Sequence, residues 1–340
     1  MNDINKSRRQ QFLYPELYAS AGQQLKDALA SNLPYFASVE TIDLGVIAVY
    51  GTDFRCRLDL LMLEYTAGAP IEDVKAMYLA VVEAFEKWCQ AKVDWQFSEF
   101  PEDRGKVLPT PVELDDLGNY QQIMRLLSLG VLFHEGTLLQ RAYAALGPWR
   151  GHDAVVEALV EDYVETPCDE AEGLCHFDLY DNLISAAWTD SPEASALHMQ
   201  TFLKSWYKTY RGQPWHDAHL RVGAIPENPH WANYYGYWAF EAGALSYLYE
   251  LDDTPWRDHL LYPKDLVDWA RQQGRPVKPA APETKPEILT ALPGQPCPET
   301  GEWFAHQLGD RKVFVEKGQP MPGPEFSSTG QVIWHLRRER

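Results

Sequence analysis

The stretch NYYGYWAFEAGALSYLYELDD, from Asn233 to Asp253, is among the most apolar and aromatic parts of the chain, yet it carries the acid Glu241 in its middle. On a helix, its apolar side chains share one face: Tyr234, Tyr237, Trp238, Ala242, Leu245, Leu248 and Tyr249. Glu241 lies inside that face. The pattern therefore predicts a packed helix in which the Glu241 carboxylate is at least partly buried.

A buried carboxylate must be paired, hydrogen-bonded or protonated, because desolvation alone costs several kcal/mol. An enzyme could use Glu241 as a general acid with a raised pKa. A lone buried Glu more often fixes the register of packed helices, and we favour this structural role. A second flank of small residues would let another helix approach closely: Gly236, Ala239, Gly243 and Ser246.

Most of the chain around this stretch also follows helical spacing. Ile71 to Cys89 has apolar residues at i, i+3, i+4 and i+7. The same period runs from Leu117 to Leu146, with breaks near Gly130 and Gly136. SPEASALHMQTFLKSWYKTY opens with Ser191 as a helix N-cap. Thr41 to Gly51 fits either a helix or a strand.

The character of the sequence changes after Gly274. GRPVKPAAPETKPE, from Gly274 to Glu287, is proline-rich and has no apolar period, which predicts a semi-extended linker. The short segments EWFAH, KVFVEKG and QVIWHL then indicate strands. We predict a mainly α protein, with an all-α helical body and a small C-terminal β module of SH3-like barrel or meander type.

The chain is strongly acidic, with 49 acidic and 30 basic residues and a net charge of −19. Residues 280–340 contain 8 acidic and 7 basic residues, so almost all of the excess lies before them. A field of this sign repels nucleic acid and anionic membrane and attracts basic partners. We therefore expect neither a nucleic acid nor a membrane as partner, although the charge could also serve solubility alone.

The N-terminal sequence, the length of the apolar runs and the cysteine pattern indicate the cellular compartment. The N-terminal sequence MNDINKSRRQQF is polar and lacks the apolar region of a secretory signal, and no apolar run is long enough to suggest a membrane span. The five cysteines include no CxxC pair, which favours free thiols over a disulfide framework. The sequence predicts a cytoplasmic protein.

Two parts of the chain resemble a known family. YYGYWAFEAGALSYLYELDDTPWRDHLLYPKDLVDWAR, from Tyr234 to Arg271, resembles the C-terminal signature of PoNi-type immunity proteins, with an aromatic helix containing Glu, a paired-acid turn, an RDH-type tripeptide and a YPxDLV helix. LDLLMLEYTAGAPIEDVKAMYLAVVEAFEKW, from Leu58 to Trp88, is similar to the family's N-terminal region, with Thr66 at the serine position of a YSxG-like turn. The expected regions are 1–110 (N-terminal helical region of PoNi type), 111–275 (C-terminal helical region of PoNi type), 276–290 (Pro-rich linker) and 291–340 (small β module).

The resemblance implies an antitoxin that binds and neutralises a cognate secreted bacterial toxin. Toxins of this kind belong to polymorphic toxin systems, including type VI secretion, and are often nucleases; the immunity protein blocks the active site and needs no cofactor. A nuclease presents basic groups to phosphates, so the acidic body agrees independently. The tail segments GQPCPETGEW, GQPMPGPE and GQVIW are similar to small β modules that accompany bacterial immunity proteins. The sequence leaves a homodimer open.

Three acidic loops are the candidate contact surface: ELDD at 113–116, CDEAE at 168–172 and ELDD at 250–253. The predicted partner-binding acids are Glu113, Asp115, Asp116, Asp169, Glu170, Glu172, Asp252 and Asp253. The second loop is the first choice, because its acids are not all needed for folding. The competing basis for binding is an aromatic patch whose charged rim contributes little.

Two other functions remain as alternatives. A cytosolic metal-assisted hydrolase would use His216 and His219 of WHDAH with an acidic partner. Further candidate ligands are Cys175, His176 and Asp178 in CHFD, and His134 and Glu135 in FHEG. None completes a known metal signature, and GxSxG, P-loop and GxGxxG motifs do not occur. We therefore predict no catalytic, cofactor-binding or metal residue and no enzyme; a helical scaffold protein is the second alternative.

Overall fold

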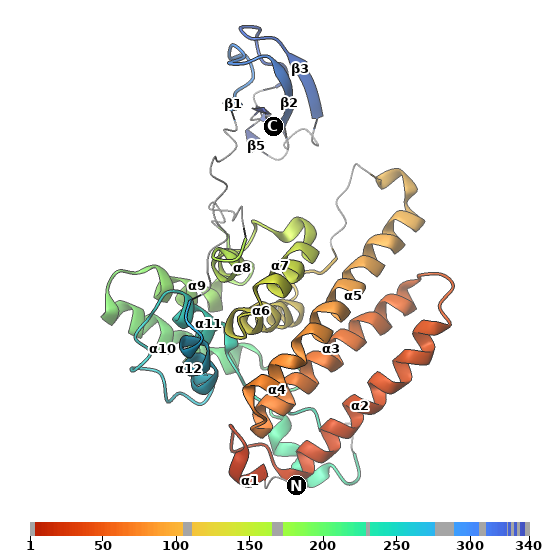
Figure 1. The fold of residues 1–340 in the computed structure, drawn as a ribbon, viewed down its shortest axis with the longest axis vertical. Coiled ribbons are helices and arrows are strands. Elements are labelled where there is room, and N and C mark those ends of the chain that lie inside the picture. The colour runs from red at the N-terminus through yellow and green to blue at the C-terminus, as the bar shows by residue number, and fades with distance from the viewer. Residues whose placement is uncertain are drawn as a thin grey trace. The chain divides into compact units, whose positions relative to one another are not determined.

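The structure, a computed structural model, describes residues 4–104, 111–164, 173–228, 232–275, 289–305, 311–324, 326–327, 330–331 and 334–336. The chain forms two compact units, Met1–Pro279 and Ala280–Arg340, called the helical unit and the β unit below (Figure 1). Each unit has a hydrophobic core of its own.

The first part of the helical unit consists of long helices. Its elements are α1 (Ile4–Ser7), α2 (Pro15–Ala37), α3 (Leu44–Ala67), α4 (Ile71–Ala76), α5 (Tyr78–Glu99) and the 3-10 helix η1 (Pro101–Asp103). Helices α2, α3 and α5 run side by side (Figure 1). The segment around Thr41 to Gly51 is helical because Asp43 caps α3, accepting a hydrogen bond from the Val46 amide at 2.8 Å. The predicted helix from Ile71 to Cys89 is interrupted at Met77.

The second part packs shorter helices around α11. Its elements are α6 (Leu117–Leu132), α7 (Gly136–Ala145), η2 (Gly147–Trp149), α8 (Ala154–Val160), α9 (Phe177–Trp188), α10 (Pro192–Thr209), η3 (Ala218–Ala224), α11 (Phe240–Leu248) and α12 (Lys264–Gln272). Every residue of α11 is buried, against α6, α8, α9 and α12. The predicted break near Gly136 is confirmed, whereas the break predicted near Gly130 is wrong, because Gly130 lies inside α6. Ser191 caps α10 as predicted, accepting from the Ala194 amide at 3.2 Å.

The helix predicted for the opening aromatic stretch is wrong in its first part. Residues 232–239 are not helical, and only the later part forms α11. Side chains from distant segments bind the backbone there: the Thr66 hydroxyl lies 2.6 Å from the Tyr235 carbonyl, and the Gln10 amide donates to the Tyr237 carbonyl at 2.6 Å. These tertiary hydrogen bonds satisfy the backbone outside a helix and override the helical pattern.

Helix α12 approaches α11 closely, as the small residues on the flank of that helix predict. A Cβ atom on Gly243 would lie 2.8 Å from the Pro263 ring and 3.0 Å from a methyl group of Val267. Such distances are too short for packed carbon atoms. Gly243 is therefore required for this helix pair to pack.

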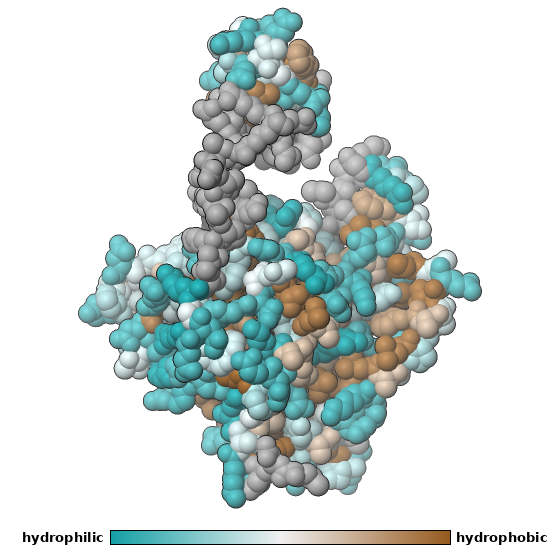
Figure 2. Space-filling view, viewed as in Figure 1, coloured by the Kyte–Doolittle hydropathy of each residue, from teal (hydrophilic) through white to brown (hydrophobic). Residues whose placement is uncertain are grey.

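The surface of the helical unit is largely hydrophilic on the face seen in Figure 2, with larger apolar areas over the long helices. Exposed apolar side chains on these helices include Leu33 in α2, Leu44 in α3 and Leu79 in α5. Among the described residues, no helix combines the length and the apolar character needed to cross a membrane.

The β unit contains a small antiparallel sheet. Its strands are β1 (Leu289–Ala291), β2 (Gly301–Ala305), β3 (Arg311–Val315), β4 (Phe326–Ser327), β5 (Gly330–Gln331) and β6 (Trp334–Leu336). The four-stranded sheet has the order β1-β6-β2-β3, so β6 pairs between β1 and β2, whereas a simple meander pairs strands in sequence order; β4 pairs with β5. The fully buried Trp303 and Trp334 form the centre of its core. The predicted mainly α fold with a small C-terminal β module is confirmed.

Two GQP segments pair with each other in the β unit. The Gly294 amide donates to the Met321 carbonyl at 2.8 Å, and the Gly318 amide donates to the Cys297 carbonyl at 2.8 Å. Both glycines have a positive φ, 79° and 86°, a conformation that favours glycine. The repeated motif therefore forms a paired turn whose buried side chains, Cys297 and Met321, belong to the core.

The predicted division into 1–110, 111–275, 276–290 and 291–340 stays a prediction. The two units separate between Pro279 and Ala280. Most of the predicted linker lies outside the described residues. The core of the helical unit ends at Ala270 and includes no residue of the β unit.

Because the two cores are separate, we expect a chain ending at Arg275 to fold without the β unit. Its circular dichroism should keep the helical signal and a cooperative thermal transition. A chain ending at Pro263 is the matched control, because it loses the buried Leu266, Val267 and Ala270 of α12 and should unfold. Aggregation of the longer chain, or loss of its cooperative transition, would mean that the β unit completes the helical core.

Candidate functional site

Three of the predicted partner-binding acids lie together in the loop that precedes α6. Glu113, Asp115 and Asp116 are all exposed. Asp116 also has a local role, because its carboxylate caps α6 by accepting from the Asn119 amide at 2.8 Å. Among the described residues, the carboxylates of Glu113 and Asp115 show no such local role.

Side chains from other segments bind the backbone carbonyls of this loop. The indole of Trp149 donates to the Val112 carbonyl, and the Nε2 atom of His176 lies 2.9 Å from the Leu114 carbonyl oxygen. Val112 and Leu114 are themselves buried. Alternate residues thus anchor the loop, and the acids between them stand on a fixed backbone.

The start of α9 is fixed to the same region by Asp153. This residue is fully buried, and its carboxylate accepts from the Tyr120 hydroxyl at 3.0 Å and from the Cys175 amide at 2.9 Å. It also caps α8 through the Val155 and Val156 amides. One buried carboxylate therefore joins α6, α8 and the segment that leads into α9.

That segment adds an aromatic side chain to the acids. Phe177 is 62% exposed and Asp178 is exposed beside it, directly after the His176 ring that contacts the first loop. We call this surface the acidic edge, made of Glu113, Asp115, Asp116, Phe177 and Asp178. The predicted acids Asp169, Glu170 and Glu172 lie outside the described residues and come shortly before Gly173 in the sequence.

The Cys175 thiol next to the acidic edge is not activated. Burial, with smaller contributions from the nearby carboxylates of Asp153 and Asp115, raises its pKa to about 12. A thiol with such a pKa is protonated at neutral pH, whereas a cysteine nucleophile must be a thiolate. Cys175 is therefore poorly suited to act as a nucleophile.

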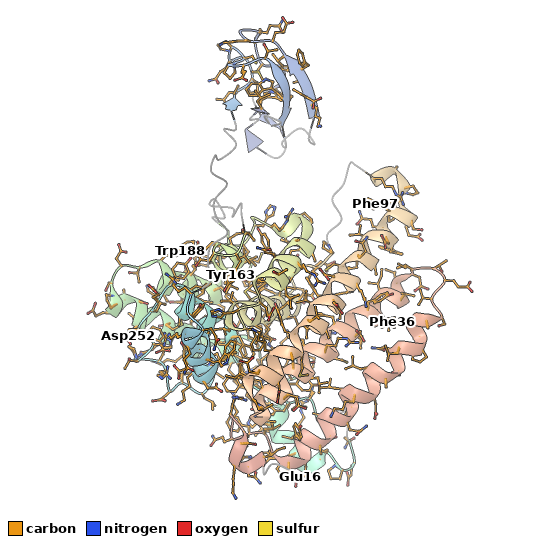
Figure 3. All side chains as sticks on the ribbon, viewed as in Figure 1. Glu16, Phe36, Phe97, Tyr163, Trp188 and Asp252 are labelled. Carbon is orange, nitrogen blue, oxygen red and sulfur yellow. The ribbon has the colours of Figure 1, made fainter. Side chains whose placement is uncertain are left out.

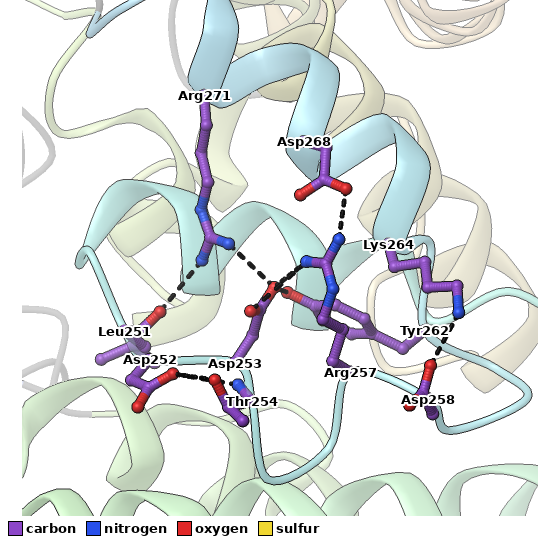
Figure 4. A network of polar contacts seen from close by, with 10 residues as sticks. All are labelled: Leu251, Asp252, Asp253, Thr254, Arg257, Asp258, Tyr262, Lys264, Asp268 and Arg271. Atoms are coloured by element: carbon purple, nitrogen blue, oxygen red, sulfur yellow. Dashed lines mark hydrogen bonds and ion pairs between the residues drawn. The ribbon is translucent and has the colours of Figure 1, made fainter.

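Asp253 is buried, in contrast to the first loop. It is 4% exposed, and its Oδ2 atom accepts from Arg271 at 3.0 Å, from Arg257 at 3.2 Å and from the Tyr262 hydroxyl at 2.9 Å (Figure 4). Arg257 also pairs with Asp268. The network joins the paired-acid turn to α12, so the Asp253 side chain does not lie where a partner would contact it.

Asp252, its neighbour, is exposed at the edge of the helical unit (Figure 3). Its carboxylate accepts from the Thr254 hydroxyl at 2.6 Å and from the Thr254 amide at 3.1 Å. These hydrogen bonds lower the Asp252 pKa. The partner-binding role predicted for Asp252 stays a prediction, and the observed hydrogen bonds order the turn.

Glu241 is buried, as its spacing predicts, with 1% of its surface exposed. Its Oε1 atom accepts from the Trp206 indole at 2.7 Å and from the Tyr180 hydroxyl at 3.2 Å, and that hydroxyl contacts Tyr210 at 2.8 Å. Burial raises the Glu241 pKa, while its own backbone amide, Trp206, Arg125 and Tyr180 oppose the shift. The carboxylate thus connects α9, α10 and α11.

A buried arginine serves as counter-charge to two acids. Arg125 is 4% exposed and lies over the Trp215 ring at 5.4 Å. Burial lowers its pKa, and the charge of Asp59 opposes this most, with that of Glu241 contributing. Burial raises the pKa of Asp59 to about 7, against the effects of Arg125 and Arg55. Arg125 of α6 therefore interacts by charge with acids of α3 and α11.

The predicted metal ligands of the hydrolase alternative have other partners. His216 Nδ1 lies 3.2 Å from Asp217, and His219 Nδ1 lies 2.8 Å from the Tyr237 hydroxyl. Within the part of the chain that the structure describes, no group of three or more His, Cys, Asp or Glu side chains could hold a metal ion. Nothing observed at these residues supports that alternative.

The two segments that carry the family resemblance meet in space. The Thr66 hydroxyl, at the serine position, lies 2.6 Å from the Tyr235 carbonyl and accepts from the Trp238 indole at 2.9 Å. The Tyr65 hydroxyl donates to Asp265 of the YPKDLV segment. Serine offers the same hydroxyl, so threonine preserves the junction.

A helical unit that carries exposed acids on an anchored edge fits a protein that acts by binding. Family models agree: "PoNe immunity protein (PoNi), N-terminal" matches residues 44–144 and "PoNe immunity proteins (PoNi), C-terminal" matches residues 151–266. The chain therefore belongs to the PoNi family of immunity proteins. It is an immunity protein that neutralises a cognate toxin and is not an enzyme, as the sequence predicts.

The fold also occurs in a solved structure. The crystal structure of protein PA2201 from Pseudomonas aeruginosa matches with a TM-score of 0.59 and 18% identity, over 79% of this chain and 92% of that chain. At this identity the likeness concerns the fold alone. No curated protein matches the chain.

Sequence reasoning missed the residues that join the N-terminal segment to the junction. Arg9 pairs with Asp265 and donates to the carbonyls of Tyr65 at 2.6 Å and Ala69 at 2.9 Å. It lies before both family matches, in a polar segment with no periodic signal. Phe177 was missed because a single aromatic residue at a helix start predicts neither burial nor exposure.

We expect Glu241→Ala to lower the free energy of unfolding by roughly 3–5 kcal/mol, because the buried Trp206 indole and Tyr180 hydroxyl lose their acceptor and the buried Arg125 loses a nearby negative charge. Glu241→Gln is the matched variant, which keeps an oxygen acceptor and should cost less. Urea unfolding followed by tryptophan fluorescence measures both. An unchanged stability together with lost protection against the toxin would assign Glu241 to function instead of packing.

Asp59 should make stability depend on pH. Its pKa is about 7 in the folded chain, against about 3.9 in an unfolded one. The folded state thus binds the proton more tightly, so this stabilising contribution is complete below the unfolded pKa and is lost as the pH rises through 7. Asp59→Asn should remove that dependence. Urea unfolding at pH 5 and pH 8 tests this, and parallel pH profiles for the two proteins would contradict it.

Proposed function

We propose that this immunity protein acts in the cytoplasm and binds a basic toxin through the acidic edge, covering the toxin's active site. The acidic edge carries the proposal, because its carboxylates are exposed on an anchored backbone. Among the described residues, no lysine or arginine side chain pairs with Glu113, Asp115 or Asp116. These charges are therefore available to a partner, unlike that of the buried Asp253.

A nuclease is the toxin class that such a surface fits best. Its active site must present basic groups to phosphates, and carboxylates at similar spacing can occupy those groups in place of the substrate. Complementary charge also raises the association rate. We accordingly propose a nuclease effector of a polymorphic toxin system, delivered by type VI secretion or a related route.

Phe177 gives the acidic edge an apolar anchor. Interfaces draw most of their binding energy from a few buried aromatic or arginine side chains within a polar rim. A phenylalanine that is 62% exposed among acids has this arrangement. We propose that Phe177 inserts into the toxin while the surrounding carboxylates pair with its basic residues.

The negative charge of the helical unit also affects which other partners it can bind. It disfavours nucleic acid and anionic membrane as ligands of the helical unit. The homodimer left open by the sequence would have to use another face, because two acidic edges repel each other. The predicted contacts at Asp169, Glu170 and Glu172 remain part of the proposal, since these acids come shortly before Gly173 in the sequence.

Charge reversal tests the proposal. We would measure association with the toxin encoded beside the gene of this chain, inactivated in its catalytic site. Glu113→Lys with Asp115→Lys, and separately Asp169→Lys, Glu170→Lys and Glu172→Lys, should slow association about tenfold at low salt, and salt near about 0.5 M should shrink the effect. Asp116 stays unchanged because it caps α6.

The matched control is Glu83→Lys with Asp94→Lys, two exposed acids of α5. It changes the net charge by the same amount as the first variant, and association should stay within about twofold of the wild type. If both of these charge-reversal variants associate like the wild type, neither the acidic edge nor the acids at 169–172 form the contact surface. A wild-type rate that is indifferent to salt would refute the charge basis altogether.

A further inference from the structure

A groove of about 570 Å³ lies on the helical unit and is separate from the acidic edge. Its walls come from the N-terminal segment, from α10, from η3 and from the loop before α12. The lining residues that matter here are Phe12, Tyr207, Asp217, Leu220, Tyr237 and Leu260. A volume of this size can take one or two large side chains or a small molecule.

The floor of the groove is aromatic and rigidly held. The rings of Phe12 and His219 lie 4.5 Å apart, and those of Tyr207 and Tyr237 lie 4.9 Å apart. The Tyr237 hydroxyl contacts His219 Nδ1 at 2.8 Å, and only 2% of Tyr237 is exposed. Because these rings are fixed by their own contacts, an occupant would not have to order them.

The rim exposes leucine side chains. Leu220 of η3 is 70% exposed and Leu260 is 43% exposed. Exposed apolar groups around a cleft, flanked by polar residues, mark an interaction site more often than isolated surface leucines do. An apolar occupant would cover both leucines and remove them from water.

One end of the groove is polar and negatively charged. Asp217 has a φ of 59°, a left-handed conformation that aspartate and asparagine adopt more readily than most residues other than glycine. Its carboxylate accepts from the Tyr207 hydroxyl at 2.6 Å, and its amide donates to the same oxygen at 3.1 Å. The hydrogen bond from Tyr207, and then His216 and His219, lower its pKa. The side chain is 52% exposed, so an ionised carboxylate remains available.

The other titratable groups of the groove define its charge. Burial lowers the pKa of His219 and of His259, so both are neutral at pH 7. Lys204 of α10 is exposed and is the one cationic side chain among the described residues of the lining. Asp217 thus favours a cationic occupant and Lys204 an anionic one. The effects of substituting each residue therefore show the sign of the occupant's charge.

The loop that carries Asp217 also contacts the start of α6, next to the acidic edge. The Trp215 indole donates to the Gln121 side chain at 3.1 Å. The side chain of Gln213 lies where a Cβ on Gly118 would contact it, at 3.1 Å. A toxin bound at Asp116 therefore lies beside the loop that leads into the groove.

We propose that the groove receives a bulky apolar side chain of the cognate toxin whose neighbouring lysine or arginine pairs with Asp217. This inference rests on the proposed function, because the basic character of the partner comes from there. The acidic edge governs encounter with the toxin, and the groove holds the complex once it has formed. The groove should therefore affect dissociation more than association.

The test uses the full chain and the same inactivated toxin, with dissociation measured by surface plasmon resonance. Leu220→Ser should speed dissociation about tenfold or more, because it removes an apolar contact that the occupant would bury. Asp217→Asn removes the charge, and asparagine tolerates the left-handed backbone; it should weaken binding about threefold. Lys204→Ala should leave binding unchanged or tighten it. Leu197→Ser, on the exposed face of α10, and Glu83→Gln are controls that should stay within about twofold.

The outcomes separate this inference from the proposed function. Wild-type rates in Leu220→Ser and Asp217→Asn, alongside slowed association in the acidic-edge variants, overturn the groove and leave the proposed function standing. Weaker binding in Lys204→Ala together with tighter binding in Asp217→Asn means an anionic occupant and also overturns the inference. A wild-type chain that does not bind this toxin overturns both. Circular dichroism of each variant confirms that the fold is kept.

Discussion

Burial of the Glu241 carboxylate is the constraint on which the helical unit depends. A buried acid needs hydrogen-bond donors or a counter-charge. Trp206 of α10 and Tyr180 of α9 donate to Glu241, and Arg125 of α6 adds a nearby positive charge. Each donor has to sit at the right height on its helix, so the acid selects one register of packing from many that would bury the same apolar surface. Such a network adds specificity more than net stability, because desolvation offsets much of the attraction.

The same rule explains why a strongly helical pattern gives way before α11. Gln10 and Thr66, from the first part of the chain, bind the carbonyls of residues 235 and 237. In a helix, those carbonyls would instead accept hydrogen bonds from backbone amides four residues later. The non-helical path instead joins the two segments matched by the family models and places Tyr237 in the floor of the groove. One local departure from the helix thus serves both cohesion and surface shape.

Periodicity and capping predicted much of the fold, including the start of α10 at Ser191, the break before Gly136 and the burial of Glu241. They could not predict the fate of individual acids. The tetrapeptide ELDD occurs twice: its final aspartate is the exposed cap of α6 at Asp116, and the buried centre of an ion network at Asp253. The difference lies in Arg257 and Arg271, which reach only the second copy. Side chains brought from elsewhere decide such outcomes, and a local sequence does not contain them.

An acid that is paired or hydrogen-bonded inside the molecule stabilises the fold. An exposed, unpaired acid on an anchored backbone can interact with a partner. The hydrogen-bonded Asp153 and the ion-paired Asp253, which are both buried, belong to the first kind. Glu113 and Asp115 belong to the second, and the loop that carries them is rigid because Val112 and Leu114 beside them are buried and hydrogen-bonded. An inhibitor of the proposed nuclease gains from this division, because fixed carboxylates lose little conformational entropy on binding. The interior acids make the scaffold stiff, and that stiffness is what turns the exterior acids into a shaped surface.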